Sequence, residues 1–432
     1  MTSWSLAFRN VWRNTRRSSA TMIAIALSCA GLLLFGGYIY WAHLAAEIHT
    51  VVLSGHLQVF KSGFKSKGSG NPAAYALANY DEIKKLMLAD PVLGPKIDLV
   101  TGQLVVSGII TSAEKQTSST FAGVGAFPDE IERVIYWNPY GLTEARQIPA
   151  NKHLFARKPE LDAADPEGIT IGEGLARLLE VSADSRASLE LTALTPAGGL
   201  PNMLSATVRQ TSIRAMEEID NHLVVMPISM ANDLVFPGEP VHVTAVLLLL
   251  RHTEDLHTVE RRIDELAREH QLDIEHRSGW ELNPNHARSL NMLDMFFAFS
   301  FCIVGVVLVF TIYNTMMMSI VERTREIGAM RTMGVTRNGI VTMFVQESVV
   351  LGLFGGLAGV VAGLVAAWCI NHSMILYTPP YFNVKAKLEL MCLHSPMIIV
   401  GSFFSSFTVA VIGAFFPARH ASRMEIVEAL RH

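Results

Sequence analysis

Four long segments without a charged side chain constrain the fold of this chain more than any other feature of its sequence. They are residues 20–42, 295–321, 348–384 and 390–418, and none of them contains Asp, Glu, Lys or Arg. Each exceeds the roughly 20 apolar residues that a helix needs to cross a bilayer. The sequence therefore predicts an α-helical membrane protein with four transmembrane helices.

The chain between the first two apolar segments, residues 46–290, has the composition of a globular protein and is long enough to bury its own core. Its predicted elements, in chain order, are a strand at 56–60, a helix at 81–88 capped by Asp81, a β-rich stretch with strands near 104–106 and 189–193, a strand at 241–250, a helix at 254–269 and a strand at 272–276. The last three form a β-α-β unit. With the early strand and helix they indicate a split α/β subdomain into which the β-rich stretch is inserted. We therefore expect a large α+β extracytoplasmic domain between transmembrane helices 1 and 2.

Arginine placement predicts the orientation in the membrane, because Lys and Arg are enriched in cytoplasmic loops. Arginines gather before the first apolar segment, between the second and third, and after the fourth. These three regions are expected in the cytoplasm, so that the large domain and the 372–395 loop face outside. The arginines are Arg9, Arg13, Arg16 and Arg17, then Arg323, Arg325, Arg331 and Arg337, and finally Arg419, Arg423 and Arg431.

The predicted parts of the chain follow from these segments. They are a cytoplasmic amphipathic helix at 1–18, transmembrane helix 1 at 19–45, the extracytoplasmic domain at 46–290, transmembrane helix 2 at 291–321, a cytoplasmic loop with a helical period at 322–343, transmembrane helix 3 at 344–371, an external loop at 372–395, transmembrane helix 4 at 396–417 and a cytoplasmic tail at 418–432.

Two features near the N-terminus each have two possible interpretations. Trp4, Phe8, Val11 and Trp12 give residues 4–17 an apolar side, which indicates a helix on the inner leaflet with its tryptophans at headgroup depth. A plain extension of the first transmembrane helix is the alternative. The first apolar segment is longer than the roughly 7–15 apolar residues of a cleaved signal peptide. We expect an uncleaved anchor, with cleavage after Ala46 as the open alternative.

No motif for catalysis or phosphate binding is present in the sequence. There is no HExxH motif, no CxxC pair and no Gly-Lys dipeptide, which a Walker A loop requires. The net charge of −4 gives no indication of nucleic-acid binding. We therefore expect neither an enzyme nor a metal or cofactor in this chain. Asp294 and Glu347 lie near the ends of apolar segments, which argues against an ion-driven transporter. Glu347 is expected to pair with a nearby arginine.

Small residues in the apolar segments have structural interpretations. Gly352, Gly356, Gly359 and Gly363 are spaced by 4, 3 and 4 residues, which puts them on one face of a helix. Small residues at such spacing let helix backbones approach closely, so we expect a helix-packing face rather than a pore. All four cysteines also lie in apolar segments. Cys369 and Cys392 flank the external loop, and a disulfide between them and two small apolar core residues both stay open.

The loop between the second and third apolar segments concentrates charges of both signs. On a helix Glu322 lies next to Arg325 and Glu326, and two glycines permit a bend or a close backbone approach. These residue types suit docking into a cleft on a soluble protein; a solvated hairpin between two helices is the alternative. The residues of interest are Glu322, Arg323, Arg325, Glu326, Ile327, Gly328, Arg331, Met333 and Gly334.

Four stretches of this sequence resemble a known family. Residues 321–334, VERTREIGAMRTMG, resemble the ER-x-REIG-x-x-R-x-x-G signature of ABC transporter permeases of the MacB/FtsX/lipoprotein-release (LolC/LolE-like) superfamily. Residues 417–431 resemble the family's PA-x-x-A-x-x-x-x-P-x-EALR ending, with Ile426 in place of its proline. Residues 55–59, GHLQV, and Gly172…Gly174-Leu175-Ala176 are similar to patterns of the lipoprotein-release branch. The family's order of one helix, a large external domain and three further helices is also the order predicted for this whole chain.

The resemblance implies a mechanism and partners. In this family two permeases, identical or related, form a dimer above a cytoplasmic ABC ATPase dimer, which binds ATP and Mg²⁺. The 322–343 loop would be the coupling helix, and the long first and second helices would transmit ATP-driven motion to the periplasmic domain. The chain would act as a lever rather than as a tunnel. The implied location is the bacterial inner membrane, and a periplasmic lipid carrier or adaptor protein is a further candidate partner.

The resemblance leaves three functions open. They are extraction of lipoproteins or lipids from the membrane, MacB-like efflux of a drug, peptide or other periplasmic molecule, and FtsX-like signalling to a cell-wall hydrolase. A lipidated substrate needs an apolar groove at membrane level; the alternative is that its candidate residues face lipid or the dimer partner. Those residues are Phe35, Tyr38 and Trp41 on the first helix, and Met292, Met295, Phe296 and Phe299 on the second.

Overall fold

The chain forms two compact units. The computed structural model describes residues 3–13, 15–144, 147–151, 161–182, 186–196, 200–212, 217–378 and 385–423. The helical unit consists of Met1–His43, Ser289–Ile375 and Leu388–His432. The sheet unit consists of Leu44–Arg288 and Leu376–Lys387. The chain therefore passes between the two units four times.

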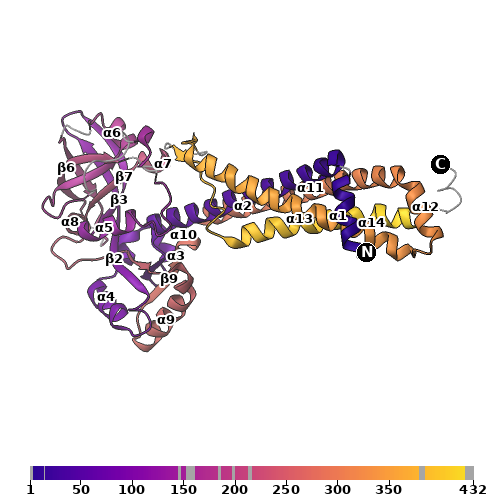
Figure 1. Cartoon of the computed structure of the whole chain (residues 1–432). Helices are drawn as coiled ribbons and strands as arrows, with labels where there is room; N and C mark the ends of the chain where they lie inside the picture. The colour runs from indigo at the N-terminus through magenta and orange to yellow at the C-terminus, as the bar shows by residue number, and fades with distance from the viewer. Residues whose placement is uncertain are drawn as a thin grey trace. The chain divides into compact units, whose positions relative to one another are not determined.

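Four long apolar helices run through the helical unit (Figure 1). They are α2 (Thr15–Ser54), α11 (Pro284–Glu322), α13 (Arg337–His372) and α14 (Pro396–Ser422). Their most apolar windows have mean hydropathies of 2.1 to 2.7, and each helix is long enough to cross a membrane. Two short helices, α1 (Ser3–Arg13) and α12 (Thr324–Thr332), complete the unit. The predicted fold class is confirmed: four candidate spans, with a large α/β domain between the first and second.

Two of the predicted packing glycines on α13 face α14. A Cβ at Gly356 would lie 2.8 Å from the ring of Phe403, and one at Gly352 would lie 3.1 Å from the ring of Phe407. Both phenylalanines belong to α14. Glycine therefore lets these rings lie directly against the backbone of α13.

The other two predicted glycines face α2, so the expected single packing face is divided between two helices. A Cβ at Gly359 would lie 2.6 Å from the carbonyl oxygen of Ala26, and one at Gly363 would lie 2.7 Å from Leu33. Gly355, which the sequence analysis did not single out, also meets α2. Gly355, Gly359 and Gly363 thus form a stripe at intervals of four residues along which α2 and α13 approach closely.

A nine-stranded sheet forms the frame of the sheet unit (Figure 1). Its strands are β1 (Leu57–Lys61), β2 (Ile97–Ser112), β3 (Thr117–Ala126), β4 (Gly168–Gly172), β5 (Ser188–Ala193), β6 (Asn202–Ser212), β7 (Leu223–Pro227), β8 (Ala245–Leu250) and β9 (Ile274–Ser278). The order is β3-β7-β4-β6-β5-β2-β8-β1-β9, and β2 also pairs with β3. This extra pairing closes the six strands from β2 through β7 into a ring. The core of the ring includes Leu104, Ile110 and Ile169.

Strands β1, β8 and β9 extend the sheet beyond the ring. β1 lies between β8 and β9 and is antiparallel to both, and α9 (Leu256–Glu269) connects β8 to β9. The expected split α/β part with a β-rich insertion is therefore present, with one difference. β2 belongs to both parts, because its residues 97–103 pair with β8 and its residues 103–112 pair with β3.

Short helices connect and cover the strands. They are α3 (Phe64–Lys67), α4 (Tyr80–Ala89), α5 (Pro128–Ile135), α6 (Glu173–Leu178), α7 (Glu217–Asp220), α8 (Ile228–Val235) and α10 (Gly279–Leu282). The N-cap of α4 is Asn79, so the expected capping role of Asp81 is wrong; Asp81 lies in the first turn. The strand expected at 272–276 begins at Ile274, because Gln271 has a φ of 51° and ends the turn after α9.

Residues 54–59 make the transition from α2 to β1. Gly55 has a φ of 66°, which favours glycine, and its N–H donates to the carbonyl of Val51 (2.8 Å) at the end of α2. The side chain of His56 is buried. Its Nδ1 accepts from the N–H of Leu250 (3.1 Å), and its Nε2 donates to Oγ1 of Thr253 (3.1 Å). These bonds fix the neutral tautomer, and burial lowers the pKa of His56 from 6.5 to about 4.

A bulkier residue at Gly359 should weaken the contact of α2 with α13. We expect Gly359→Val to destabilise the chain by about 1–3 kcal/mol, because the new side chain would overlap the backbone of Ala26. Gly401→Val on α14 is the control, since no atom lies within 4 Å of a Cβ there. The measurement is the melting temperature of both variants in detergent. Equal melting temperatures would contradict the close approach.

Acid should destabilise the sheet unit through His56. Because the pKa of His56 in the fold is about 4, below the unfolded value of 6.5, its contribution is complete above pH 6.5 and is lost as the pH falls through 4. The loss approaches about 3 kcal/mol. Denaturant unfolding of the full chain between pH 7 and pH 4 measures it. A His56→Gln variant with the same pH dependence as the wild type would contradict this assignment.

Candidate functional site

The candidate site is the segment that connects α11 to α13 and contains α12. α11 ends at Glu322, and α12 follows after Arg323. Gly334 has a φ of 92°, which favours glycine where the chain turns after α12. Thr336 then caps α13, since its Oγ1 accepts from the N–H of Gly339 (3.2 Å). The charge-rich loop of the sequence is therefore a short helix between two sharp turns.

Some of the singled-out residues hold α12 in place. Ile327 and Gly328 are buried, and Ile327 packs in an apolar cluster with Ile340 and Phe344 of α13. Ala418 and Ala421 of α14 complete this cluster. Arg331 is half-buried. Ile327 therefore helps to fix the position of α12 on α13 and α14.

The other singled-out residues face outward. Arg325, Glu326, Met333 and Gly334 are exposed, and the side chain of Met333 is 76% exposed. Val335 adds a further exposed apolar side chain to the turn. An exposed methionine between charged side chains suits contact with a soluble protein, because its flexible thioether adapts to varied apolar surfaces.

A buried ion pair joins the start of α12 to α13. Nη1 of Arg323 lies 3.3 Å from Oε2 of Glu347, and both side chains are only 6% exposed. This confirms the expectation that Glu347 pairs with a nearby arginine. Arg17 and Ser319 line the same small cavity of about 10 Å³, the lower limit for one water molecule. Nε and Nη2 of Arg323 have no hydrogen-bond partner among the described residues.

Two further ion pairs join the N-terminal part of the chain to α12 and to the end of α11. Arg13 of α1 binds Glu326 (2.8 Å), and Arg17 at the start of α2 binds Glu322. The sequence analysis noted all four residues and missed these pairs. The spacing in the sequence could not reveal these pairs, because the four residues belong to four different helices, α1, α2, α11 and α12.

The predicted groove residues do not share one environment. Phe35 packs edge-to-face on Phe297 of α11, with ring centroids 5.2 Å apart. Tyr38 stacks on Trp41 at 5.8 Å and packs against the cluster of Leu33 and Cys392. The four α11 residues are all exposed at a spacing typical of one helix face; they are Met292, Met295, Phe296 and Phe299.

The predictions for Cys369, Cys392 and the C-terminal tail can be compared with the structure. Cys369 and Cys392 are both free, so they form no disulfide in this structure; Cys392 is buried, and its Sγ donates to the carbonyl of Leu33 (3.4 Å). In the tail, Pro417 to Ser422 belong to α14. The EALR part of the tail, with Ile426, lies outside the described residues.

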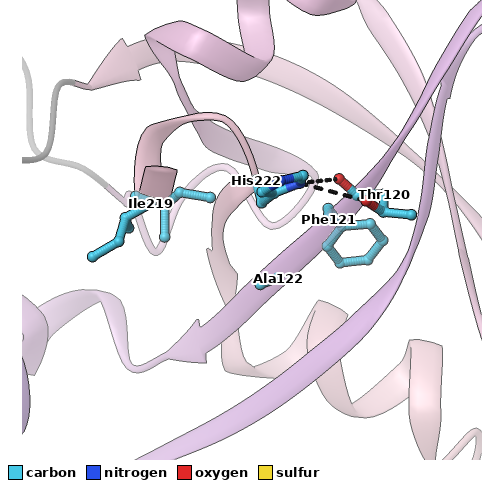
Figure 2. Close-up of a pocket in the computed structure, with 6 residues that line it drawn as sticks. Thr120, Phe121, Ala122, Ile219 and His222 are labelled. Carbon is cyan, nitrogen blue, oxygen red and sulfur yellow. Dashed lines mark hydrogen bonds between the residues drawn. The ribbon is translucent and has the colours of Figure 1, made fainter. Parts of the chain in front are cut away.

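A separate cavity of about 380 Å³ opens on the sheet unit (Figure 2). His222 lies at its edge and donates from Nδ1 to the carbonyl of Thr120 (3.1 Å). Its lining residues are Thr120, Phe121, Ala122, Ile219, His222 and Leu223. No sequence motif pointed to it. In the part of the chain that the structure describes, no group of three or more His, Cys, Asp or Glu side chains is placed to hold a metal ion.

Comparison with known proteins finds a family match in the helical unit. Residues 297–426 match the family model described as FtsX-like permease C-terminal. This range includes α12, α13, α14 and most of α11, and therefore the Arg323–Glu347 pair. An ABC transporter permease of Methanocaldococcus jannaschii is 39% identical over 120 residues, which are 28% of this chain and 28% of that protein.

Longer similarity extends to the whole chain at lower identity. The pyoverdine export ATP-binding/permease protein PvdT of Pseudomonas aeruginosa is 24% identical over 439 residues, which cover 98% of this chain and 58% of that protein. The matches thus cover less than two thirds of the length of either relative. The crystal structure of the periplasmic region of MacB from Actinobacillus actinomycetemcomitans has 11% identity and a TM-score of 0.31, and the match covers 53% of this chain and 91% of that one.

Removing one partner of the buried pair should destabilise the helical unit. We expect Arg323→Met to cost about 3–5 kcal/mol, because Glu347 would remain buried without a counter-charge. The double variant Arg323→Met/Glu347→Met should recover most of this loss, since no charge is left buried. Thermal unfolding in detergent measures both. A double variant no more stable than the single one would show that the pair is not the cause.

Proposed function

We propose that this chain, which carries an FtsX-like permease domain, is the membrane-spanning subunit of an ABC transporter that transmits motion to its sheet unit. The observation that carries this proposal is the construction of α12. It is a short helix with an exposed outer side, Met333 included, and it is anchored to α13 by the buried Arg323–Glu347 pair. A partner that pushes on α12 therefore moves α13 as well.

A cytoplasmic ATPase dimer that binds ATP and Mg²⁺ is the partner proposed for α12. The sequence of this chain contains no Gly-Lys dipeptide and so no Walker A loop of its own. PvdT is named as an ATP-binding and permease protein, which supports the association of this kind of permease with ATP hydrolysis. The arginine distribution supports a cytoplasmic place for α12, in a bacterial inner membrane with the sheet unit in the periplasm.

Continuous helices support transmission from one unit to the other. α2 runs unbroken from Thr15 to Ser54 and α11 from Pro284 to Glu322, so each belongs to both units. The loop between α13 and α14 adds a third connection. Its short strands β10 (Leu376–Tyr377) and β11 (Ala386–Lys387) belong to the sheet unit. There the buried side chain of Asn151 binds the backbone N–H and carbonyl of Lys385 (3.0 and 2.7 Å).

A second permease, identical or related, is the partner proposed for α11. Only 11% of the residues in the apolar window of α11 are buried, the lowest share among the four spans. Beyond the group from Met292 to Phe299, exposed apolar side chains continue along this helix and include Ile303, Val306, Val307 and Phe310. Covering this face with another permease would bury apolar side chains that otherwise face lipid.

The proposed activity is extraction of a lipoprotein or lipid from the membrane. The exposed aromatic and methionine side chains at the outer part of α11 support it, because they offer an apolar surface to acyl chains. Export of a soluble molecule is a second candidate, which the name of PvdT favours. Signalling to a cell-wall hydrolase has no specific observation in its favour. A periplasmic lipid carrier would accompany the first activity and an adaptor the second.

The docking role of α12 predicts the effect of one exposed substitution. Met333→Lys should weaken binding of the ATPase about 30-fold, since loss of a central apolar contact costs about 2 kcal/mol. Leu200→Lys, also at an exposed position but in the sheet unit, is the matched control. The measurement is the amount of ATPase that co-purifies with the tagged chain from its own membrane, and its rate of ATP hydrolysis. Mass spectrometry identifies the bound cargo.

The outcomes separate the parts of the proposal. Wild-type chain without any ATPase would overturn the transporter assignment itself. Unchanged ATPase with Met333→Lys would move the docking site away from the α12 turn. An ATPase together with acylated protein or lipid supports extraction, whereas an ATPase with an adaptor and no lipidated cargo supports export.

A further inference from the structure

An aromatic stripe runs along the exposed side of α1. Trp4, Phe8 and Trp12 are 52%, 46% and 66% exposed, and their spacing of four residues places them on one face of the helix. The rings of Phe8 and Trp12 are stacked at 5.6 Å. Val11, on another side of the helix, is buried in a cluster with Ile25 and Leu308. α1 is therefore fixed to the bundle by Val11, and the aromatic stripe points away from the cluster.

The stripe is continuous with the surface of a membrane span. The ring of Phe8 lies 6.3 Å from that of Phe354 on α13. Phe354 is itself exposed and lies within one of the four candidate spans. Aromatic side chains that border an apolar span are typical of the membrane–water interface, where tryptophan is enriched. The surface that covers the stripe is therefore the same bilayer that covers α13.

The arginines around α1 fall into two pairs. Arg13 and Arg17 bind Glu326 and Glu322 at the α12 end of the bundle. Arg9 and Arg16 are exposed, and neither forms an ion pair with any acidic residue in the part of the chain that the structure describes. Among the described residues these two cations thus have no counter-charge, and both are near the stripe in the chain: Arg9 follows Phe8, and Arg16 stands at the start of α2. Lipid headgroups of negative charge would supply what they lack.

We propose that α1 and the start of α2 form a docking surface for anionic phospholipid headgroups, with Arg9 and Arg16 as the binding cations. The aromatic stripe places the helix at headgroup depth, and the two arginines then contact the phosphates. A lipid bound there holds α1 in place, and Arg13 passes this restraint to Glu326 on α12. The inference goes beyond the transport role and does not depend on which substrate is carried.

Lipid titration of the purified full chain tests the proposal. Delipidated protein in detergent is titrated with phosphatidylglycerol or phosphatidylcholine, and bound lipids are counted by native mass spectrometry. The wild type should bind phosphatidylglycerol more tightly. The variant Arg9→Gln/Arg16→Gln should bind it about 30-fold more weakly, since each arginine near an anionic surface contributes about 1 kcal/mol. Its affinity for phosphatidylcholine should not change.

Two controls make the result specific. Arg251→Gln/Arg288→Gln removes the same charge from exposed positions of the sheet unit and should leave lipid binding unchanged. Trp12→Ala should weaken both lipids equally, because it removes only the apolar contact. Equal affinity of the wild type for the two lipids, or equal losses in both arginine double variants, would overturn the proposal. So would a Trp12→Ala variant that turns a dimer into a monomer, since the stripe would then belong to a protein interface.

Discussion

The buried ion pair between Arg323 and Glu347 determines how the helical unit is built around α12. Two charges in an apolar bundle are tolerated only when each neutralises the other, so the pair fixes one register of α12 on α13. The apolar cluster of Ile327 and Phe344 then fills the remaining contact. Well-packed apolar side chains would hold such a helix as tightly as an ion pair. The value of the pair lies in allowing a single arrangement.

A second fixed connection lies within the sheet unit, where α2 ends and β1 begins. α2 continues without a break to Ser54, and Gly55 turns the chain directly into β1. The hydrogen bonds of His56 to Leu250 and Thr253 then tie this turn to the neighbouring strand β8 and the loop that follows it. Gly55 and His56 thus join the end of α2 directly to β1, the strand between β8 and β9.

The sequence was sufficient for features that depend on local composition, and insufficient for those that depend on distant partners. Charge-free segments locate the four candidate spans, because each is longer than the roughly 20 apolar residues that a helix needs to cross a bilayer. No local sequence pattern indicates that β2 and β3 close the ring, because one part of β2 pairs with β8 and another part pairs with β3. Likewise the position of Asn79 rather than Asp81 at the cap of α4 depends on where the preceding turn ends.

Two features of the helical unit show, in physical terms, what the sequence could not predict. In an apolar span, periodicity cannot tell which face meets which helix, because lipid and protein neighbours are equally apolar. The glycines of α13 therefore predicted close packing and left open that Gly356 meets α14 while Gly359 meets α2. The ion pairs at the α12 end of the bundle show the same limit. Arg13 binds Glu326 and Arg17 binds Glu322, but the four residues belong to four helices, so their spacing in the sequence did not predict the pairs. Arg9 and Arg16 form no ion pair with an acidic residue among those that the structure describes. That surplus of positive charge beside exposed tryptophans is what calls for an anionic surface.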